Sequence, residues 1–187
     1  MVFSCPGTEE KKSGKLVSGK TGENLDIILQ YLYNNLSCIF HSALRYDYRI
    51  TNASNIVHPN ETDKRTEPSI KEIKAASNLR RLYNEIKDFT YVISFGNRAE
   101  RAVIECLKDK EKIPIHIHCK YHLGLQSINR RIKKDINKNK ISIQKNNKKI
   151  SVDNNLKRLE VVYSELFSEI QNTLKSACPA TSCQPSK

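Results

Sequence analysis

The sequence predicts an α/β fold, a three-layer α/β/α sandwich around a central, mostly parallel sheet of four strands. Short apolar stretches of strand length alternate along the chain with longer segments whose apolar residues recur at helical spacing. Strands that alternate with helices form βαβ units, in which the strands run parallel and helices cover both faces of the sheet. The length of 187 residues suits one domain, which we expect over residues 1–177, with a loose tail over residues 178–187.

The first half of the chain supplies two of the expected strands. Residues 1–4 form a short strand, and residues 24–36 then place leucine and isoleucine at the spacing of a helix. The second strand covers residues 47–52 and ends on Thr51-Asn52, at the carboxyl edge of the sheet, where open α/β folds bind their ligands. The Asn52 amide can donate and accept at once, so it can match the edge of a nucleobase. The alternative is a strand-end asparagine that caps its own backbone.

The remaining elements follow the same alternation. Ser69 and Glu72 form a Ser-x-x-Glu start signal, which predicts a helix over residues 70–87. The elements expected after it are a strand over residues 90–95, a helix over residues 97–108 and a strand over residues 113–118. A basic, asparagine-rich segment over residues 129–155 follows. A final helix then places apolar residues from Leu156 to Leu174 on one face, with Asp153 or Asn154 as its cap.

The net charge favours nucleic acid as the partner. The chain carries +12 at neutral pH, and residues 130–149 contain nine basic residues and one acidic residue. Basic side chains neutralise phosphates and release counterions, which dominates non-specific affinity for DNA. The residues that we expect to contact DNA through their charge are Lys20, Arg130, Arg131, Lys133 and Lys134. The alternative for the basic segment is a solvated loop that contacts nothing.

Hydropathy and cysteine usage are typical of a soluble, cytoplasmic protein, which we expect to act on DNA as a monomer without cofactors or membrane contact. The mean hydropathy is −0.59, and no apolar run approaches the ~18 residues of a membrane span. The six cysteines are scattered, a pattern typical neither of a zinc site nor of a disulfide framework. Three histidines and a cysteine lie close together from His116 to His122, but their spacing is unlike that of a closed zinc site, so we expect no metal.

Five blocks of the chain resemble the uracil-DNA glycosylase superfamily, and they occur in the same order. The blocks are Val2–Glu10 (VFSCPGTEE), Gly14–Asp26 (GKLVSGKTGENLD), Thr51-Asn52, Tyr91–Ala99 (YVISFGNRA) and Ile113–Ile128 (IPIHIHCKYHLGLQSI). The first block is similar to the first active-site motif of that superfamily, and the last is similar to a strand that enters the second. The order of all five makes the resemblance more specific than any single block would.

The resemblance implies a monofunctional DNA glycosylase. Such an enzyme flips a pyrimidine out of the duplex and hydrolyses its N-glycosidic bond, which leaves an abasic site. Asn52 matches the base-reading residue of the superfamily, and Ser4, Gly7 and Val17 would line the base pocket. His122 matches the histidine that hydrogen-bonds O2 of the base, where negative charge develops as the bond lengthens.

Two positions depart from the pattern of the superfamily. Cys5 stands where other members place Asp or Asn before the proline, and a thiol is a poor base unless its pKa is lowered. Glu10, or else Glu9, is therefore the carboxylate that we expect to position water, with Cys5 beside it. Val17 stands where relatives stack an aromatic ring on the base, so the pocket has more room. The expected substrate is uracil or a modified, bulky cytosine as in phage DNA, in DNA repair or anti-phage defence.

Further residues admit two interpretations each. Leu123 and Leu125 are candidates for the wedge that fills the gap left by a flipped base, with core packing as the alternative. Residues Gly14–Thr21 match the spacing of a P-loop, but a Walker loop should follow a buried strand, which disfavours a nucleotide-dependent protein. A catalytically weak protein that senses modified or damaged bases is the remaining alternative, and Cys5 favours it.

Overall fold

The computed structural model describes residues 1–58, 65–142 and 148–177. Within it the chain forms two compact units. The first contains residues 1–19 and 46–122, and the second contains residues 20–45 together with the described residues from Leu123 onward. Each unit is described separately below.

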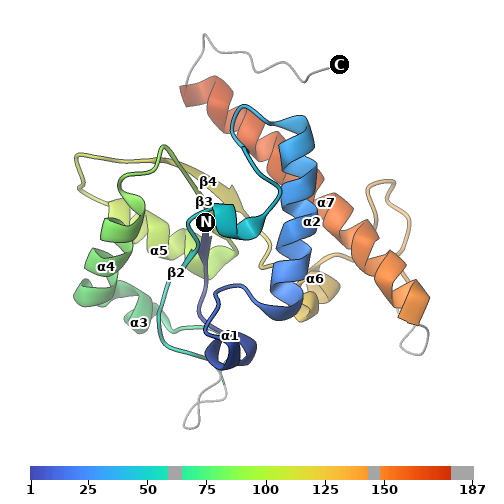
Figure 1. The fold of residues 1–187 in the computed structure, drawn as a ribbon, viewed down its shortest axis with the longest axis horizontal. Helices are drawn as coiled ribbons and strands as arrows, with labels where there is room; N and C mark the ends of the chain where they lie inside the picture. The colour runs from blue at the N-terminus through green and yellow to red at the C-terminus, as the bar shows by residue number, and fades with distance from the viewer. Residues whose placement is uncertain (59–64, 143–147, 178–187) are drawn as a thin grey trace. The chain divides into compact units, whose positions relative to one another are not determined.

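The first unit contains a four-stranded sheet that is parallel throughout (Figure 1). Its strands are β1 (Val2–Phe3), β2 (Thr51–Asn52), β3 (Tyr91–Phe95) and β4 (Ile115–Cys119), in the order β2-β1-β3-β4. The predicted α/β class and parallel four-stranded sheet are confirmed. Together with the seven α-helices among the described residues, the sheet is consistent with a three-layer α/β/α fold.

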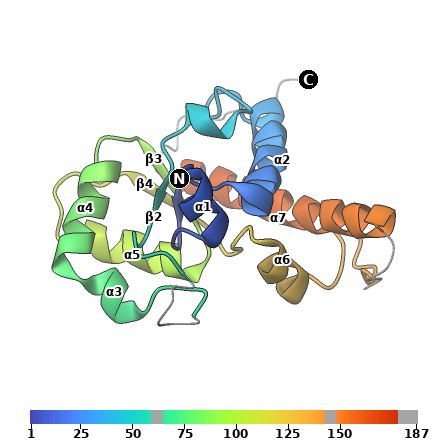
Figure 2. The same cartoon turned by 60° about the horizontal axis from the view of Figure 1, so that its bottom comes forward.

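Four helices belong to the first unit: α1 (Thr8–Ser13), α3 (Ile70–Lys74), α4 (Ala76–Ile86) and α5 (Asn97–Leu107). The predicted capping box is present, because Ser69 and Glu72 bind each other's backbone amides at the start of α3. The single helix expected over residues 70–87 is wrong, since the extended backbone of Ala75 separates α3 from α4. Figure 2 shows α3, α4 and α5 together beside the strands.

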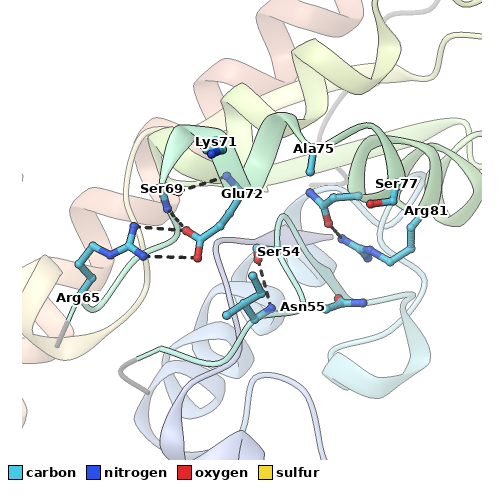
Figure 3. Close-up of a pocket in the computed structure, with 11 residues that line it drawn as sticks. Ser54, Asn55, Arg65, Ser69, Lys71, Glu72, Ala75, Ser77 and Arg81 are labelled. Atoms are coloured by element: carbon cyan, nitrogen blue, oxygen red, sulfur yellow. Dashed lines mark hydrogen bonds and ion pairs between the residues drawn. The ribbon is translucent and has the colours of Figure 1, made fainter. Parts of the chain in front are cut away.

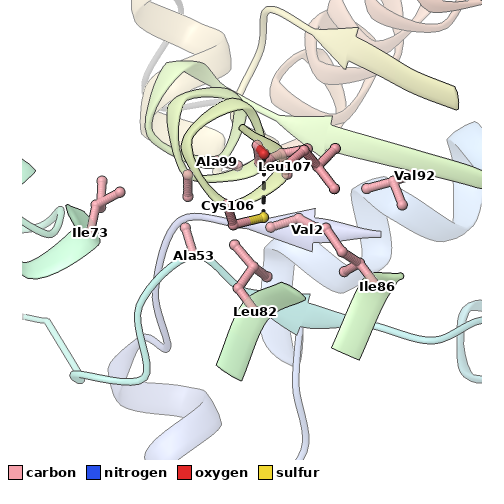
Figure 4. Packing of buried hydrophobic residues seen from close by; sticks show 11 residues of the cluster. Val2, Ala53, Ile73, Leu82, Ile86, Val92, Ala99, Cys106 and Leu107 are labelled. Atoms are coloured by element: carbon pink, nitrogen blue, oxygen red, sulfur yellow. Dashed lines mark hydrogen bonds between the residues drawn. The ribbon is translucent and has the colours of Figure 1, made fainter. Parts of the chain in front are cut away.

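The core of the first unit lies between the sheet and these three helices (Figure 4). Val2 and Val92 project from β1 and β3, and they pack with Leu82 of α4 and Cys106 of α5. Alternate residues of a strand point to opposite faces, so this face carries every second strand residue. Phe3 lies on the other face, where its ring stacks on Phe95 with the centroids 4.8 Å apart.

The second unit contains α2 (Gly19–Asn35), α6 (Leu125–Arg131) and α7 (Lys148–Ala177). The Tyr31 ring of α2 stacks on the Tyr163 ring of α7, with centroids 3.9 Å apart. Because α7 begins at Lys148, the predicted cap at Asp153 or Asn154 is wrong. Asn154 lies inside α7, and its side-chain amide donates to the Ser142 carbonyl at 2.8 Å. No helix in the described parts of the chain is long and apolar enough to cross a membrane.

Candidate functional site

At the centre of the sheet, the chain changes the side on which it adds its next strand. The chain passes from β1 to β2 on one side and then to β3 on the other side of β1. In open α/β sheets the crevice beyond the carboxyl ends of two such strands is where ligands bind. The segments that leave this edge are Ser4–Gly7 after β1, Ala53–His58 after β2, Gly96 after β3 and Lys120–His122 after β4. Ser4, Cys5, Gly7 and His122, four of the seven residues predicted for catalysis or base binding, lie in these segments.

The segments after β1 and β2 stay paired beyond the strands. The amide N–H of Ala53 donates to the Phe3 carbonyl at 2.7 Å, and that of Ser54 donates to the Ser4 carbonyl at 3.0 Å. Further on, the His58 N–H donates to the Pro6 carbonyl at 3.0 Å. Residues 53–58 are therefore attached to the first motif through Ala53, Ser54 and His58.

Asn52 is buried, with 2% of its surface exposed, and among the described residues neither its side-chain nitrogen nor its side-chain oxygen has a hydrogen-bond partner. The neighbouring Thr51 hydroxyl bonds Arg81 and Glu85 of α4, so the Asn52 side chain lies on the opposite face of the sheet, in register with Phe3. Its main-chain carbonyl accepts from Arg81 at 2.7 Å, which fixes the backbone. The amide does not cap its own backbone, so that alternative is wrong.

An unpaired buried polar group costs about 1–3 kcal/mol of stability. The Asn52 side chain contributes two such groups, a donor and an acceptor side by side on one amide. A planar ligand that offers an acceptor next to a donor would satisfy both. Pyrimidine edges have this pattern.

Glu10 shapes the loop after the first motif. One carboxylate oxygen accepts from the Gly7 N–H at 2.5 Å, and the other accepts from the Val17 N–H. Val17 itself is buried and adopts a positive φ of 51°, a conformation that is strained for a β-branched residue. The carboxylate predicted to position water thus holds Gly7 and Val17 in place, and these are two of the residues predicted to line the pocket. The other candidate carboxylate, Glu9, is exposed and pairs with Lys12.

Cys5 is a neutral thiol in this fold. Burial raises its pKa to about 11, although the Ser4 hydroxyl acts in the opposite direction. Its sulfur lies 3.7 Å from the Thr66 carbonyl and 3.9 Å from the Ser4 Oγ. A protonated thiol cannot accept a proton, so Cys5 cannot serve as a general base. Ser4 is itself buried, with 2% of its surface exposed.

His122 lies beyond β4, against the end of β3. Gly96 has a φ of +85°, and a Cβ added to it would lie 3.2 Å from the His122 Cβ and 3.3 Å from the His122 nitrogen. The Gly96 N–H also donates to the Cys119 carbonyl at 2.8 Å, which joins the ends of β3 and β4. Glycine at position 96 is therefore needed for the close approach that sets the place of His122, whose side chain is half-buried.

The two strand histidines before it bind a serine. Ser94 Oγ lies 2.8 Å from His116 Nε2 and 3.2 Å from His118 Nδ1, and His118 Nε2 lies 3.5 Å from a Glu100 oxygen. Burial, with the nearby His118, lowers the pKa of His116 to about 4, so that ring is neutral near pH 7. Among the described residues, no group of three or more His, Cys, Asp or Glu side chains could hold a metal ion.

His58 is a buried residue beside the first motif that the sequence did not single out. Its side chain is fully buried, and neither ring nitrogen has a hydrogen-bond partner in the described parts of the chain. The Nε2 atom lies 3.6 Å from Glu72 Oε1, at ion-pair distance. The position of His58 after Ile56-Val57 gives no local signal of burial, because its surroundings come from the first motif and from α3.

A cavity of about 640 Å³ opens beside the segment that follows β2 (Figure 3). Its charged lining consists of Arg65, Lys71, Arg81 and Glu72, with hydroxyls from Ser54, Ser69 and Ser77. In Figure 3 the Arg65 guanidinium faces the Glu72 carboxylate, and its Nη1 lies 3.3 Å from Oε2. Asn52 and His122 do not line this cavity, whose excess of positive charge suits an anion such as a phosphate.

The predicted DNA-contact residues lie in the second unit. Leu123 has no exposed surface, which favours the core-packing alternative over a wedge, whereas Leu125 is half-buried at the start of α6. Lys20 is exposed and pairs with Glu23 at 2.6 Å. Arg130, Arg131, Lys133 and Lys134 are all exposed, as phosphate contacts would require.

The P-loop alternative is wrong for Gly14–Thr21. This segment follows helix α1, not a strand, and runs into α2. A Walker loop connects a buried strand to a helix, so the match is one of spacing alone.

A comparison with models of known protein families finds no match to the chain, and neither does a search of curated proteins.

Proposed function

We propose that this protein is a DNA glycosylase of the uracil-DNA glycosylase type, which flips a pyrimidine and hydrolyses its N-glycosidic bond. The observation that carries the proposal is the buried Asn52 amide at the carboxyl edge of the sheet, whose donor and acceptor both lack a partner within the part of the chain that the structure describes. The five sequence blocks that resemble the superfamily support it, because they contribute Asn52 and the segments next to it. A monofunctional enzyme of this kind leaves an abasic site.

In the proposed reaction Asn52 reads the base and His122 stabilises it as it leaves. The Asn52 amide accepts from N3–H and donates to O4 of uracil, or takes the turned-over rotamer for N3 and N4 of a cytosine. A donor from His122 faces O2, where negative charge grows while the glycosidic bond lengthens. Gly96 sets the place of His122, and Glu10 sets the places of Gly7 and Val17 around the base.

The substrate that we propose is uracil or a bulky modified cytosine, in DNA repair or in defence against phage. Val17 supplies an aliphatic wall, and its backbone is fixed by Glu10. Val17→Phe should therefore slow the excision of a bulky pyrimidine, because overpacking a filled site costs about 1–3 kcal/mol. Uracil excision by the same variant should stay equal or improve through stacking on the ring. Equal effects on both bases would place residue 17 away from the substrate.

DNA would be held by charge as well as by the base pocket. The exposed cations of residues 130–134 and the cationic side chains around the cavity beside α3 are the surfaces that fit phosphates. We propose that the protein acts as a monomer, since base flipping needs one binding site and no cofactor. We propose the cytoplasm as the place where it acts.

The test is excision from a panel of defined duplexes. Purified protein is incubated with strands that carry uracil, cytosine, 5-hydroxymethylcytosine or glucosylated hydroxymethylcytosine, and abasic sites are then cleaved with alkali. We expect strand scission for uracil or for at least one modified cytosine and none for cytosine, and Asn52→Asp should abolish it because a carboxylate cannot donate. Absence of scission on every duplex, and on genomic DNA from phages with modified cytosine, would contradict the proposal.

The second candidate function is a sensor that binds a flipped base without excising it. The neutral Cys5 thiol favours it, because a protonated thiol cannot take a proton from water, and the Glu10 carboxylate is already bound to the main-chain amides of Gly7 and Val17. A sensor would bind one modified duplex more tightly than the others in an anisotropy assay while leaving no alkali-labile site. Asn52→Asp should weaken that preference.

A further inference from the structure

The Asn52 amide is not oriented by hydrogen bonds of its own. Among the described residues its side-chain nitrogen and oxygen have no partner, although the residue is buried. Such a side chain takes its direction from the main chain that carries it and from the packing around it, because only rotatable bonds join the amide to the backbone. The groups that hold the main chain at Asn52 therefore decide where its amide points.

Two side chains of α4 hold the main chain directly after Asn52. The Arg81 Nη2 donates to the Asn52 carbonyl at 2.7 Å, and the Asn78 Nδ2 donates to the Ala53 carbonyl at 2.7 Å. The N–H groups of the same two peptides donate to carbonyls at the end of β1 and just after it, at 2.7 and 3.0 Å. Both peptide groups that follow the Asn52 Cα are therefore bonded at oxygen and at nitrogen.

The Arg81 guanidinium is itself fixed by three further acceptors. Its Nη1 donates to Glu85 Oε2 at 2.8 Å and to Thr51 Oγ1 at 3.2 Å, and its Nη2 donates to Asn78 Oδ1 at 3.0 Å. The planar fork of arginine binds these acceptors together, whereas the ammonium group of lysine does not reproduce their directions. Arg81 thus joins both residues of β2, Thr51 and Asn52, to one helix.

One side of this network is open to solvent. Asn78 and Arg81 line the cavity of about 640 Å³ beside α3 (Figure 3), and 21% of the Arg81 side chain is exposed. A small cation can therefore reach the place of the guanidinium when this side chain is shortened. Chemical rescue is thus possible at position 81.

We propose that Arg81 and Asn78 are positioning residues for base recognition, an assignment that rests on the proposed function. They act on the base only through Asn52, by holding the main chain so that its donor and acceptor keep one orientation toward the pyrimidine edge. Loss of either bond lets this main chain shift, and a misplacement of about 1 Å can cost about 10²-fold in rate. It also weakens the discrimination between base edges, which depends on polar groups at fixed places.

The experiment measures single-turnover excision by Arg81→Ala and Arg81→Lys on two duplexes. One carries the base that the wild type removes, and the other carries an analogue altered at position 4: 4-thiouracil for uracil, or the N4,N4-dimethyl form of a cytosine. We expect the rate on the parent base to fall by about 10–10²-fold and the preference for that base over the analogue to shrink. A change that only lowers the folded fraction reduces both rates alike and leaves their ratio constant.

Rescue and two control variants separate positioning from folding. Added guanidinium should restore part of the rate and of the preference in Arg81→Ala, while urea and ammonium should not, because neither combines charge with a planar fork. Arg80→Ala, at an exposed neighbour on α4, should behave as the wild type with and without guanidinium. Ile86→Val, in the core under the same helix, should lower the melting temperature without changing the ratio of rates.

Asn78→Asp tests the second bond. A carboxylate at this position can still accept from Arg81 but cannot donate to the carbonyls of Ala53 and Ile73. An acidic residue in the first turn suits the start of α4, so the helix should remain folded. We expect a smaller loss of rate than in Arg81→Ala, with a reduced preference for the parent base.

Two results would overturn the assignment while leaving the proposed function intact. One is a wild-type rate and ratio in Arg81→Ala. The other is a loss of rate on both duplexes with an unchanged ratio and no guanidinium rescue, which would mean that Arg81 supports folding alone. If Arg81→Ala does not fold, the ratios of Arg81→Lys and Asn78→Asp decide in the same way. A wild type that excises no base from any duplex would overturn the proposed function, and the assignment with it.

Discussion

Two loops leave neighbouring strands at the same edge of the sheet, and they differ in whether their polar groups are satisfied. In the loop after β1, the Glu10 carboxylate accepts from the main chain of Gly7 and Val17. At the end of β2 and in the segment after it, the side chains of Asn52 and His58 are buried and make no hydrogen bond to any described residue. Folded proteins pair nearly all their buried polar groups. The first loop is therefore held in shape by its own side chain, whereas the Asn52 amide keeps a donor and an acceptor that no described residue binds.

The largest expected effect tests the unsatisfied loop. Asn52→Ala should lower single-turnover excision by about 10²–10³, the cost of one preorganised donor. The free energy of unfolding should stay the same or rise, because the variant removes a buried donor and acceptor that have no partner. Asn55→Ala, three residues further on at an exposed position, is the control. Loss of stability in Asn52→Ala, measured by urea unfolding, would mean that its amide has a partner in the folded chain.

The satisfied loop should show the reverse pattern. Glu10→Ala leaves the Gly7 and Val17 amides without their charged acceptor, and we expect the free energy of unfolding to fall by about 1.5–3 kcal/mol. Glu9→Ala is the matched control, because its exposed ion pair with Lys12 contributes at most about 1 kcal/mol. Urea unfolding of both variants measures the difference. Equal stability of the two would show that Glu10 does not hold the loop.

The same contrast separates what the sequence predicts from what it does not. The alternation of strands and helices predicts the parallel sheet, and Ser69 with Glu72 predicts the start of α3, because both signals are local. Helix α1 is missed since none of its residues is buried, so it has no apolar periodicity. The break at Ala75 is missed because alanine favours helix and carries no stop signal.

The site follows the same rule. Asn52 is predictable because it ends a strand, and the residues on either side of it indicate where that strand ends. The role of Glu10 is not predictable, since it depends on the amide of Val17, seven residues away. His58 is hidden for the same reason: Pro6 and Glu72 surround it through the fold and not through sequence proximity.

A third prediction concerns the close approach of β3 to His122. Gly96→Ala combines a positive φ with a Cβ placed 3.2 Å from the His122 Cβ, and we expect it to lower stability by about 1–3 kcal/mol and to slow excision. Gly14→Ala has a similar φ of +66° but nothing within 4 Å of the added Cβ, so it isolates the backbone strain. The difference between the two variants in excision rate measures the effect of displacing His122. Identical rates would show that Gly96 does not set the position of His122.

The smallest expected effect per residue concerns the exposed cations, which should add affinity without adding preference for a base. Changing Arg130, Arg131, Lys133 and Lys134 to Ala should weaken binding to all duplexes alike and flatten the dependence of affinity on salt, by up to ~0.9 in log–log slope for each phosphate that the variant no longer neutralises. The control removes the same charge elsewhere, through Lys87, Lys108, Lys110 and Lys112 to Ala.

If net charge alone attracts DNA, the two fourfold variants should change the slope equally, and the basic segment has no special place. If the segment binds phosphates directly, only its own variant should change the slope, while the ratio of affinities for modified and plain duplexes stays constant. That ratio belongs to Asn52, whose amide is the group that can distinguish one base edge from another. If a basic-segment variant altered base preference, that result would contradict the proposed division of roles, in which Asn52 recognises the base and the exposed cations bind the DNA backbone.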